Sequence, residues 1–333
     1  MGGEGRGAPH HEQIERAGAG RGRRGSHHSE ESRREGEEAV VEDRTGEVTA
    51  RPDVTDAGCR DAVGALAHEG AHAVLDTGRY LLRLTVWGSG PPLVILHGLS
   101  DAVRGFAMVM HQLAPHFTCV AYELPNGLDD GARLGAYRHR DLTSDLYALL
   151  DHLKLGRVAL LGSSFGTTVA LRALAERPER FTKCVLKGGF AFRPLRWYER
   201  FGARQGRYWD GRLCELPFRE FAMRRACPAT WGGCSPLARA LFLDCNGRTP
   251  IRAAARRAVA LDSLDLRPLL PTIAAPVLLI GGDRDRIVPW GCEAVLARGL
   301  RDVRRVEFQD CGHYPQYTHP GATAAAVRAF LAE

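Results

Sequence analysis

The sequence predicts an α/β protein in which helices cover both faces of a mostly parallel sheet. Short apolar runs alternate with stretches of helical periodicity in two parts of the chain, which is the pattern of consecutive βαβ units. About eighty residues between those parts break the alternation and are helical in pattern. With 333 residues, 44% of them hydrophobic, the chain is long enough for one sizeable core that carries an insertion.

The N-terminal segment differs in composition from the rest of the chain. Residues 1–68 are rich in Gly, Arg, Glu and His, as in GAGRGRRGSHHSEESRREGEE. So few apolar residues bury too little surface to offset the conformational entropy that is lost on folding. We therefore expect residues 1–68 to form a disordered, low-complexity tail.

The α/β core is expected at residues 69–189 and 269–333. HAVL and YLLRLTVWG flank Asp76, Thr77 and Gly78, so two strands joined by turn residues are predicted to form a hairpin. Further strands are expected in LVILHG (93–98), TCVAYE (118–123), VALLG (158–162), KCVLKGG (183–189), APVLLIGG (275–282) and VRRVEF (303–308), and helices at 106–113, 140–153, 165–176 and 322–333.

Residues 190–268 are predicted to form a helical cap that sets specificity, because insertions of this kind commonly shape the pocket. Its aromatic rings include Phe190, Phe192, Trp197, Tyr198, Phe201, Tyr208, Trp209, Phe218, Phe221 and Trp231. They favour a hydrophobic acyl or aromatic substrate, although we expect most of these rings to pack within the cap. Its arginines, among them Arg193, Arg196, Arg200, Arg204, Arg207, Arg224 and Arg225, would select an anionic substrate or contact lipid headgroups, but a solvated face is the simpler interpretation.

Charge and cysteine content argue against several classes of partner. The net charge is +6, but the arginines are dispersed and the only lysines are Lys154, Lys183 and Lys187, so we expect no nucleic-acid partner. Nine cysteines form no CxxC pair and no grouping with His at zinc spacing, and we interpret them as reduced thiols of a cytoplasmic protein. The apolar runs fall short of the roughly 20 residues that a membrane span needs, and we expect neither a span nor a secretory signal.

The turn GSSFG (162–166) is the strongest functional signal in the chain. It spells G-x-S-x-G between a strand that ends at Leu161 and a helix that begins at Phe165, which is the setting of a nucleophile elbow. Glycines at both ends suit a sharp turn because a side chain there would clash with neighbouring backbone. We therefore predict that Ser164 is a nucleophile; the alternative is a glycine-rich turn with an idle serine.

A serine hydroxyl needs a general base and a third group that orients the base. His313 follows the last predicted strand in the loop CGHYPQYTHP and is our candidate base. Its rival His319 better fits a capping or surface position before Pro320. The acid is expected in GGDRDRIVP, where Asp283 and Asp285 can each reach an imidazole, and the unused one would satisfy backbone N–H groups.

Together these motifs resemble the α/β-hydrolase superfamily. The chain order Ser, Asp, His is the order of that fold, and GSGPPLVILHG, GSSFG, GGDRDRIVP and CGHYPQYTHP match its oxyanion loop, elbow, acid loop and histidine loop. The resemblance covers about residues 72–189 and 270–333 and implies an eight-stranded type of sheet. It also favours Asp285, which precedes Val-Pro by three residues, and implies that the N–H groups of Phe165 and Leu99 form the oxyanion hole. Glu123 departs from the Asp that such proteins commonly carry after the fourth strand.

The sequence thus predicts a serine hydrolase that cleaves a small carboxylic ester or related acyl compound through an acyl-enzyme on Ser164, with no cofactor and no metal. The same triad would serve hydrolytic C–C cleavage or acyl transfer, and both stay open as alternatives. Aspartate-nucleophile dehalogenases and epoxide hydrolases are disfavoured because position 164 is Ser. Outside enzyme chemistry, the alternative is a ligand-binding protein of the same fold. The expected partner is a small acyl substrate, and no oligomeric state is predicted.

Overall fold

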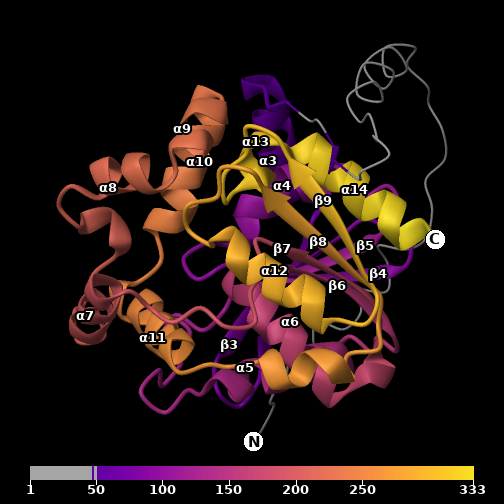
Figure 1. Ribbon diagram of the computed structural model, residues 1–333, viewed down its shortest axis with the longest axis horizontal. Helices are drawn as coiled ribbons and strands as arrows, with labels where there is room; N and C mark the ends of the chain where they lie inside the picture. The colour runs from indigo at the N-terminus through magenta and orange to yellow at the C-terminus, as the bar shows by residue number, and fades with distance from the viewer. Residues whose placement is uncertain (1–46, 49–50) are drawn as a thin grey trace, which may run out of the picture. The chain divides into compact units, whose positions relative to one another are not determined.

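A nine-stranded sheet lies at the centre of the computed structural model, which describes residues 47–48 and 51–333 (Figure 1). Its order is β1-β9-β8-β7-β6-β4-β5-β3-β2, and neighbours are parallel except for β2–β3 and β3–β5. The strands are β1 (Glu47–Val48), β2 (Ala71–Asp76), β3 (Leu81–Trp87), β4 (Pro92–Leu96), β5 (Thr118–Tyr122), β6 (Val158–Ser163), β7 (Phe181–Lys187), β8 (Val277–Gly282) and β9 (Val303–Phe308). The predicted α/β class, its eight strands and the β2–β3 hairpin are confirmed, and β1 adds a two-residue strand beside β9.

Helices cover both faces of the sheet. On one face lie α3 (Asp56–Glu69), α4 (Ala107–Leu113) and α14 (Pro320–Ala332), and on the other lie α5 (His139–His152), α6 (Phe165–Glu176) and α12 (Trp290–Gly299). Helix α12 was not among the helices predicted from the sequence. In β6, Val158 and Leu160 belong to the core beneath α5 and α6, whereas Ala159 and Leu161 belong to the core beneath α4. A strand that is buried on both sides is an unbroken apolar run, which is why the sequence revealed it.

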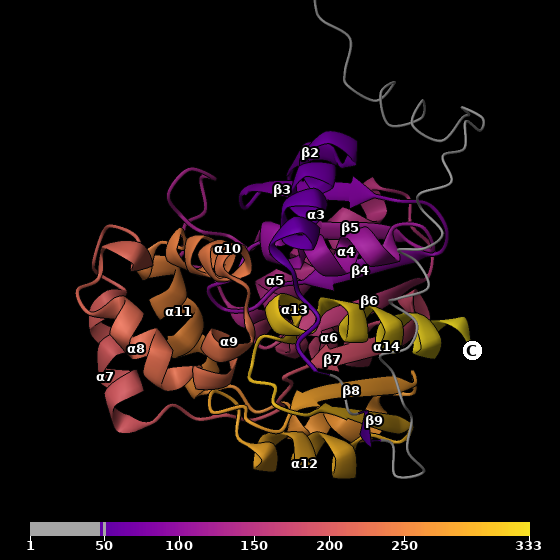
Figure 2. The ribbon, with the colours of Figure 1, turned by 90° about the horizontal axis from the view of Figure 1, so that it is seen from above.

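The connection from β7 to β8, which the structure describes throughout, contains five α-helices. They are α7 (Trp197–Gly206), α8 (Arg219–Ala226), α9 (Pro228–Gly233), α10 (Pro236–Gly247) and α11 (Ile251–Asp262). Figure 2 shows them gathered beside one end of the sheet. They meet the core where Ser100, just after β4, donates a hydrogen bond of 3.0 Å to Asn246 of α10. The insertion therefore lies over the end of the sheet that contains the carboxyl terminus of β4. No helix among residues 47–48 and 51–333 is both long and apolar enough to cross a bilayer.

The predicted end of the tail at residue 68 is wrong. α3 begins at Asp56, and the Thr55 side chain accepts an N–H of its first turn. Cys59 and Ala62 are buried in a cluster with Met108 of α4. The apolar residues of α3 recur at helical spacing among small and charged ones, so the polar average of the segment concealed its apolar face. Most of the predicted tail lies outside the residues that the structure describes.

The expectation that most rings of the insertion pack internally is also wrong. Seven of the ten rings named above are exposed: Trp197, Tyr198, Phe201, Tyr208, Trp209, Phe218 and Phe221. Phe190 is buried, and Phe192 and Trp231 are half-buried. Aromatic content alone does not say which way a helix turns its rings; that depends on the size of the residues on its opposite face.

A charge placed on the inner face of α3 tests whether this helix belongs to the core. Ala62→Asp buries an unpaired carboxylate, and we expect it to lower the free energy of unfolding by about 3 kcal/mol in urea denaturation. Ala67→Asp, on the exposed face of the same helix, is the matched control and is expected to change it by less than about 0.5 kcal/mol. Equal effects of the two substitutions would contradict the packing of α3.

Candidate active site

Ser164 occupies the turn between β6 and α6 with a strained backbone. Its φ is 51° and its ψ is −115°, in a region that residues with a side chain rarely adopt. Two backbone hydrogen bonds hold it there: the Ser164 N–H donates to the Lys187 carbonyl at 2.8 Å, and the Ser164 carbonyl accepts from the Thr167 N–H at 2.9 Å. The turn thereby lifts the Ser164 side chain out of the path of the strand.

The two glycines of the motif allow neighbouring backbone to approach this turn. A Cβ at Gly162 would lie 2.9 Å from the Cα of Thr167, and one at Gly166 would lie 2.8 Å from the His97 carbonyl oxygen and closer still to that of Leu96. Either methyl group would push α6 away from β6 or from the end of β4. The sequence interpretation of these glycines as steric necessities agrees with these distances.

The structure brings the three predicted side chains together in one chain of hydrogen bonds. Ser164 Oγ lies 2.8 Å from His313 Nε2, and His313 Nδ1 lies 2.6 Å from Asp285 Oδ2. Asp285 Oδ1 accepts the N–H groups of Ile287 and Val288 at 2.8 and 2.9 Å. Because Asp285 accepts from Nδ1–H, the Nε2 lone pair faces the serine hydroxyl.

The two rival residues lie elsewhere. Asp283 accepts the Cys311 N–H at 2.9 Å, so it holds the histidine loop through its backbone, the role expected of the unused acid. His319 is the N-cap residue of α14, in agreement with the capping position suggested by its sequence context, but it is fully buried and not at the surface. Its ring stacks on Phe308 with ring centroids 5.7 Å apart. Its Nδ1 lies 2.7 Å from the hydroxyl of Thr318.

The charge of Asp285 is maintained by its surroundings. Burial acts to raise the pKa of Asp285. The charge of His313, its hydrogen bond to Asp285 and the two backbone N–H groups outweigh this effect and bring the pKa below its ordinary value. The carboxylate therefore stays ionised at neutral pH. An ionised, immobile Asp285 stabilises an imidazolium at His313 whenever that ring takes up a proton.

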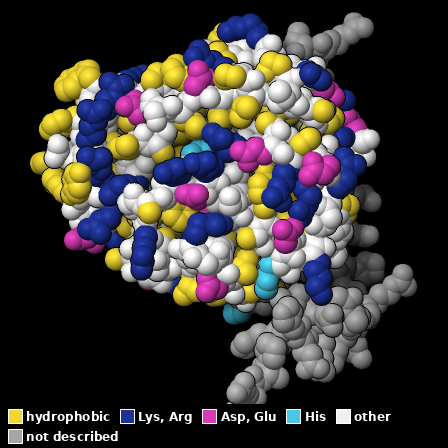
Figure 3. Space-filling view, turned by 90° about the horizontal axis from the view of Figure 1, so that it is seen from below, with side chains coloured by type: hydrophobic (Ala, Val, Ile, Leu, Met, Phe, Trp, Pro, Cys, Tyr) yellow, Lys and Arg dark blue, Asp and Glu magenta, His cyan; other side chains and the backbone are white. Residues whose placement is uncertain are grey.

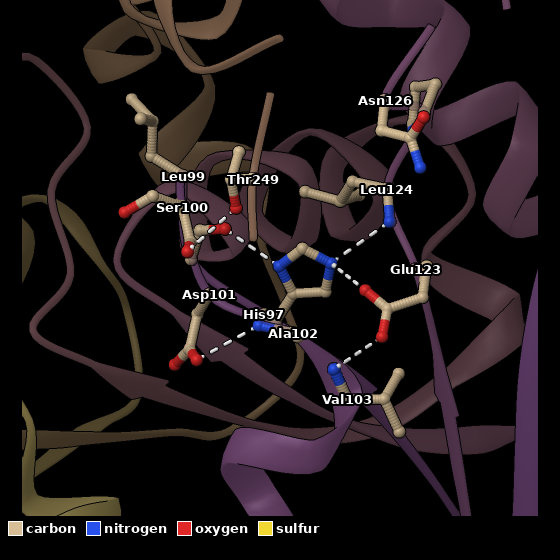
Figure 4. A network of polar contacts seen from close by, with 12 residues as sticks. His97, Leu99, Ser100, Asp101, Ala102, Val103, Glu123, Leu124, Asn126 and Thr249 are labelled. Carbon is tan, nitrogen blue, oxygen red and sulfur yellow. Dashed lines mark hydrogen bonds and ion pairs between the residues drawn. The ribbon is translucent and has the colours of Figure 1, made fainter. Parts of the chain in front are cut away.

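Leu99 and Phe165, the predicted oxyanion donors, both line the same cavity as Ser164 and His313. Phe165 is the first residue of α6, so its N–H has no acceptor within the helix. The loop that carries Leu99 is fixed by His97, whose Nδ1 lies 2.8 Å from the Gly98 carbonyl and whose Nε2 lies 3.0 Å from the Leu124 N (Figure 4). In the sequence, His97 stood out only as part of a motif.

Glu123 sits behind this loop and does not line the cavity. One of its oxygens accepts the Val103 N–H at 2.9 Å, and the other lies 3.3 Å from His97 Nε2 (Figure 4). Burial acts to raise the pKa of Glu123, but contact with His97, the Val103 N–H and the charge of Arg257 hold the pKa below its ordinary value. The departure from the usual Asp therefore affects how the loop is supported, not the wall of the cavity.

Arg257 of α11 ties the insertion to two loops of the core. Its guanidinium donates to the carbonyl of Leu99 and to the carbonyls of Leu124 and Pro125, the latter two at 3.1 and 2.8 Å. Burial lowers the pKa of Arg257 to about 10, so it remains charged at neutral pH. A buried guanidinium on three carbonyls fixes the spacing between α11 and the Leu99 loop.

A cavity of about 240 Å³ opens beside Ser164. Most of its wall is apolar and comes from Leu99, Phe165, Phe190, Leu195, Ala258, Leu261, Ile287, Val288 and Tyr314. The one cation in the wall, Arg193, pairs with Glu199, which lies 2.9 Å away and also lines the cavity. Among the described residues, no group of three His, Cys, Asp or Glu side chains is placed to bind a metal ion. The carboxylate of Asp101 also lines the cavity and accepts hydrogen bonds from Gln316 and Tyr317. The cavity thus offers a mostly apolar space next to the serine, with no unpaired cation among the described residues of its wall.

A family model described as "alpha/beta hydrolase fold" matches residues 91–320. The chain belongs to this family. The 2-(acetamidomethylene)succinate hydrolase of Mesorhizobium japonicum is 26% identical to it, over 77% of this chain and 94% of its own. A 2-hydroxymuconate semialdehyde hydrolase of a Pseudomonas species is 27% identical, over 74% and 88%. A pimeloyl-[acyl-carrier protein] methyl ester esterase of Stenotrophomonas maltophilia is 28% identical, over 75% and 96%. The chain is therefore an enzyme of the α/β-hydrolase family, whose relatives are hydrolases named for different substrates.

This α/β-hydrolase also contains a buried polar network that the sequence analysis missed. Lys187 Nζ donates to the His313 carbonyl at 3.1 Å and to Gln316 Oε1 at 2.7 Å. Gln316 Nε2 in turn donates to Asp101 at 2.8 Å, and Tyr317 donates its hydroxyl to the same carboxylate at 2.7 Å. Because Lys187 can only donate, it fixes the orientation of the Gln316 amide. The network joins β7, the histidine loop and the segment after Leu99.

One sequence signal could have revealed Lys187. It is the last residue of β7 and follows the buried apolar run Cys184, Val185 and Leu186, and lysine is almost never fully buried without a partner. Burial lowers the pKa of Lys187 to about 8, while the charges of Asp101 and Asp285 act to raise it. A lysine in such a strand indicates a carboxylate nearby in the fold, here Asp101.

The lowered pKa of Lys187 gives stability a specific pH dependence. Between pH 8 and 10.5, the unfolded chain holds the lysine proton more tightly than the folded chain, so this group makes stability rise with pH. Relative to Lys187→Met, the wild type should gain up to about 3 kcal/mol across that window in urea denaturation. A stability difference that does not change with pH would show that Lys187 titrates as an ordinary lysine.

Proposed function

We propose that this enzyme is a serine hydrolase that cleaves a small carboxylic ester or related acyl compound through an acyl-enzyme on Ser164. The observation that carries the proposal is the unbroken chain from Ser164 Oγ through His313 to Asp285 at the wall of an apolar cavity. An ester hydrolase among the relatives, the pimeloyl-[acyl-carrier protein] methyl ester esterase, supports the choice of bond. All nine cysteines are free thiols, and with them we propose a cytoplasmic location.

In the acylation step, Ser164 Oγ attacks the acyl carbonyl carbon while His313 Nε2 takes the hydroxyl proton. The carbonyl oxygen becomes an oxyanion, which the N–H groups of Leu99 and Phe165 stabilise. Asp285 stabilises the imidazolium and prevents its ring from turning. The tetrahedral intermediate collapses when the carbon–oxygen bond to the leaving group breaks and His313 returns its proton to the departing alkoxide.

Deacylation repeats these steps with water in place of Ser164. His313 Nε2 takes a proton from water as the oxygen attacks the acyl-enzyme carbonyl, and the same two N–H groups hold the second oxyanion. The bond between the acyl carbon and Ser164 Oγ then breaks, and His313 gives its proton back to the serine. The products are a carboxylic acid and the alcohol of the leaving group.

The cavity limits the acyl group to a small and uncharged one. Its volume of about 240 Å³ is below the roughly 300 Å³ at which pockets for drug-sized ligands begin. Arg193 is neutralised by Glu199, so no unpaired cation in the wall attracts a second carboxylate on the substrate. A substrate that carries a free carboxylate next to the scissile bond would therefore bind less well than its neutral ester.

A fluorophosphonate probe tests the nucleophile, and a pair of aspartates tests the acid. The probe should label the wild type but not Ser164→Ala. Asp285→Asn should lower kcat for p-nitrophenyl butyrate by about ten-thousand-fold, because the histidine tautomer is lost. Asp283→Asn, two residues away and without contact to His313, should stay within about tenfold of the wild type. Labelling that persists in Ser164→Ala, or equal effects of the two aspartate changes, would refute the proposed triad.

A series of p-nitrophenyl esters tests the size of the acyl site. The acetyl and butyryl esters should have a kcat/KM about tenfold or more above that of the decanoyl ester. Ala258 lines the cavity, so Ala258→Phe should lower the butyryl rate more than the acetyl rate. Ala260→Phe, on the same helix but not in the wall, is the matched control. Turnover of a vinylogous diketone without turnover of any ester would identify C–C hydrolysis instead.

A further inference from the structure

Helices α7 and α8 present large apolar side chains to solvent. Phe218 is 84% exposed, Trp197 78%, Phe201 65% and Phe221 64%, with Tyr198, Tyr208 and Trp209 exposed beside them in the chain. We call these seven rings the aromatic face. Large apolar side chains that gather on an exposed surface commonly mark a site that another surface covers.

The aromatic face results from how α7 is packed. Its inner side consists of small residues: Ala203 and Gly206 are its buried positions, and a Cβ at Gly206 would lie 3.2 Å from the Cβ of Ala255 in α11. Trp197 and Phe201 are four residues apart and therefore lie on one side of the helix. Close packing of α7 on α11 leaves no room for these rings inside, so they are not an incompletely filled core.

Helix α8 also exposes its rings, and none of its side chains is buried, although it carries Phe221 and follows Phe218. An eight-residue helix with no buried side chain gains little from packing against the protein. Its rings are therefore available to another surface.

Positive charge is concentrated around these rings. Residues 193–225 contain nine arginines and four acidic residues, a net charge of +5 out of +6 for the whole chain. Three of the four acids are already paired with arginine: Glu199 with Arg193, Asp210 with Arg252 and Glu220 with Arg224. In the described part of the chain, the exposed Arg196, Arg204 and Arg225 form no ion pair. Figure 3 shows hydrophobic and basic side chains interleaved toward the left of the molecule, the side on which Figure 1 places α7 and α8.

Rings and unpaired arginines together fit an anionic lipid surface. Tryptophan and tyrosine favour the level of the headgroups, where the ring meets acyl chains and its polar edge meets water. Arginine is attracted to the phosphates of anionic lipids. A second copy of this chain fits less well, because a symmetric contact would bring the like charges of both faces together.

We propose that the aromatic face, with Arg196, Arg204 and Arg225, docks this enzyme on an anionic membrane surface. The rings enter the boundary between headgroups and acyl chains, and the arginines contact lipid phosphates. The docked surface lies next to the cavity, since Glu199 belongs to α7 and also lines the cavity. The proposal goes beyond the proposed function and does not depend on turnover.

The test is sedimentation of the full chain with vesicles, without any substrate. Phosphatidylcholine vesicles that contain about one third phosphatidylglycerol should bind the wild type about tenfold or more tightly than pure phosphatidylcholine, and added salt should weaken the binding. The triple substitution Trp197→Ser, Phe201→Ser and Phe218→Ser should lower binding about tenfold or more. Arg196→Gln with Arg204→Gln and Arg225→Gln should remove the preference for anionic vesicles.

Exposed apolar residues elsewhere supply the matched control. Val74, Leu128 and Trp290 are 58%, 56% and 62% exposed and lie outside the insertion. Their simultaneous change to Ser should leave vesicle binding unchanged. Unaltered melting temperature and fluorophosphonate labelling would show that the variants still fold.

Three results would overturn the proposal: no binding to anionic vesicles, equal binding to both kinds of vesicle, or equal loss in the ring variant and its control. Self-association of the wild type that the ring variant lacks, without vesicle binding, would instead identify an interface between copies. The proposed hydrolase activity is measured separately, so its failure would leave the vesicle result intact.

Discussion

The left-handed backbone of Ser164 is the constraint on which the site depends. A serine at φ 51° stores strain on the order of 1–3 kcal/mol, and it persists only because its surroundings fix it. β6 lies between β4 and β7 at the middle of the sheet, and the Ser164 N–H is bound to the last carbonyl of β7. The apolar packing of three central strands thus maintains the turn that exposes the hydroxyl. The packing of the core therefore also fixes the orientation of Ser164, the proposed nucleophile.

Buried charges extend that rigidity from the serine to the loops around it. Lys187 holds the histidine loop through a carbonyl, Asp101 anchors the segment after Leu99, and Arg257 binds the Leu99 carbonyl from α11. Each charge is expensive to bury, and each makes two or more hydrogen bonds, although the Arg257 Nε finds no partner among the described residues. In the proposed mechanism, N–H donors that are fixed before the substrate arrives need no reorganisation when an oxyanion forms. Polar groups in this core therefore serve to set distances between loops that the apolar packing alone leaves adjustable.

The sheet was predicted well, and the three side chains that the structure brings together at Ser164 were found for the same reason, because both leave local signals. Strands buried on two sides are apolar runs, and GSSFG combines a motif with its strand-turn-helix context. Lys187, Gln316 and Arg257 were missed because their roles arise from contacts between segments far apart in the chain. The predicted tail boundary failed for a related reason: α3 is stabilised by α4 and α10, and its own composition is that of a polar segment. The composition of a segment shows which residues it contains, but not which other segments it contacts in the fold.

The outward direction of the α7 rings also depends on what the helix contacts, not on its composition. Helix α7 carries these exposed rings on one side and a residue of the cavity wall on another. Small residues at Ala203 and Gly206 let α7 approach α11, and that approach brings Glu199 to the cavity wall beside Arg193. With larger inner residues, α7 would stand farther from α11 and the cavity would open on that side. In α7 the small residues lie on the inner face and the large rings on the outer face. A lipid surface that held Trp197 and Phe201 would therefore act on a helix that also carries part of the cavity wall.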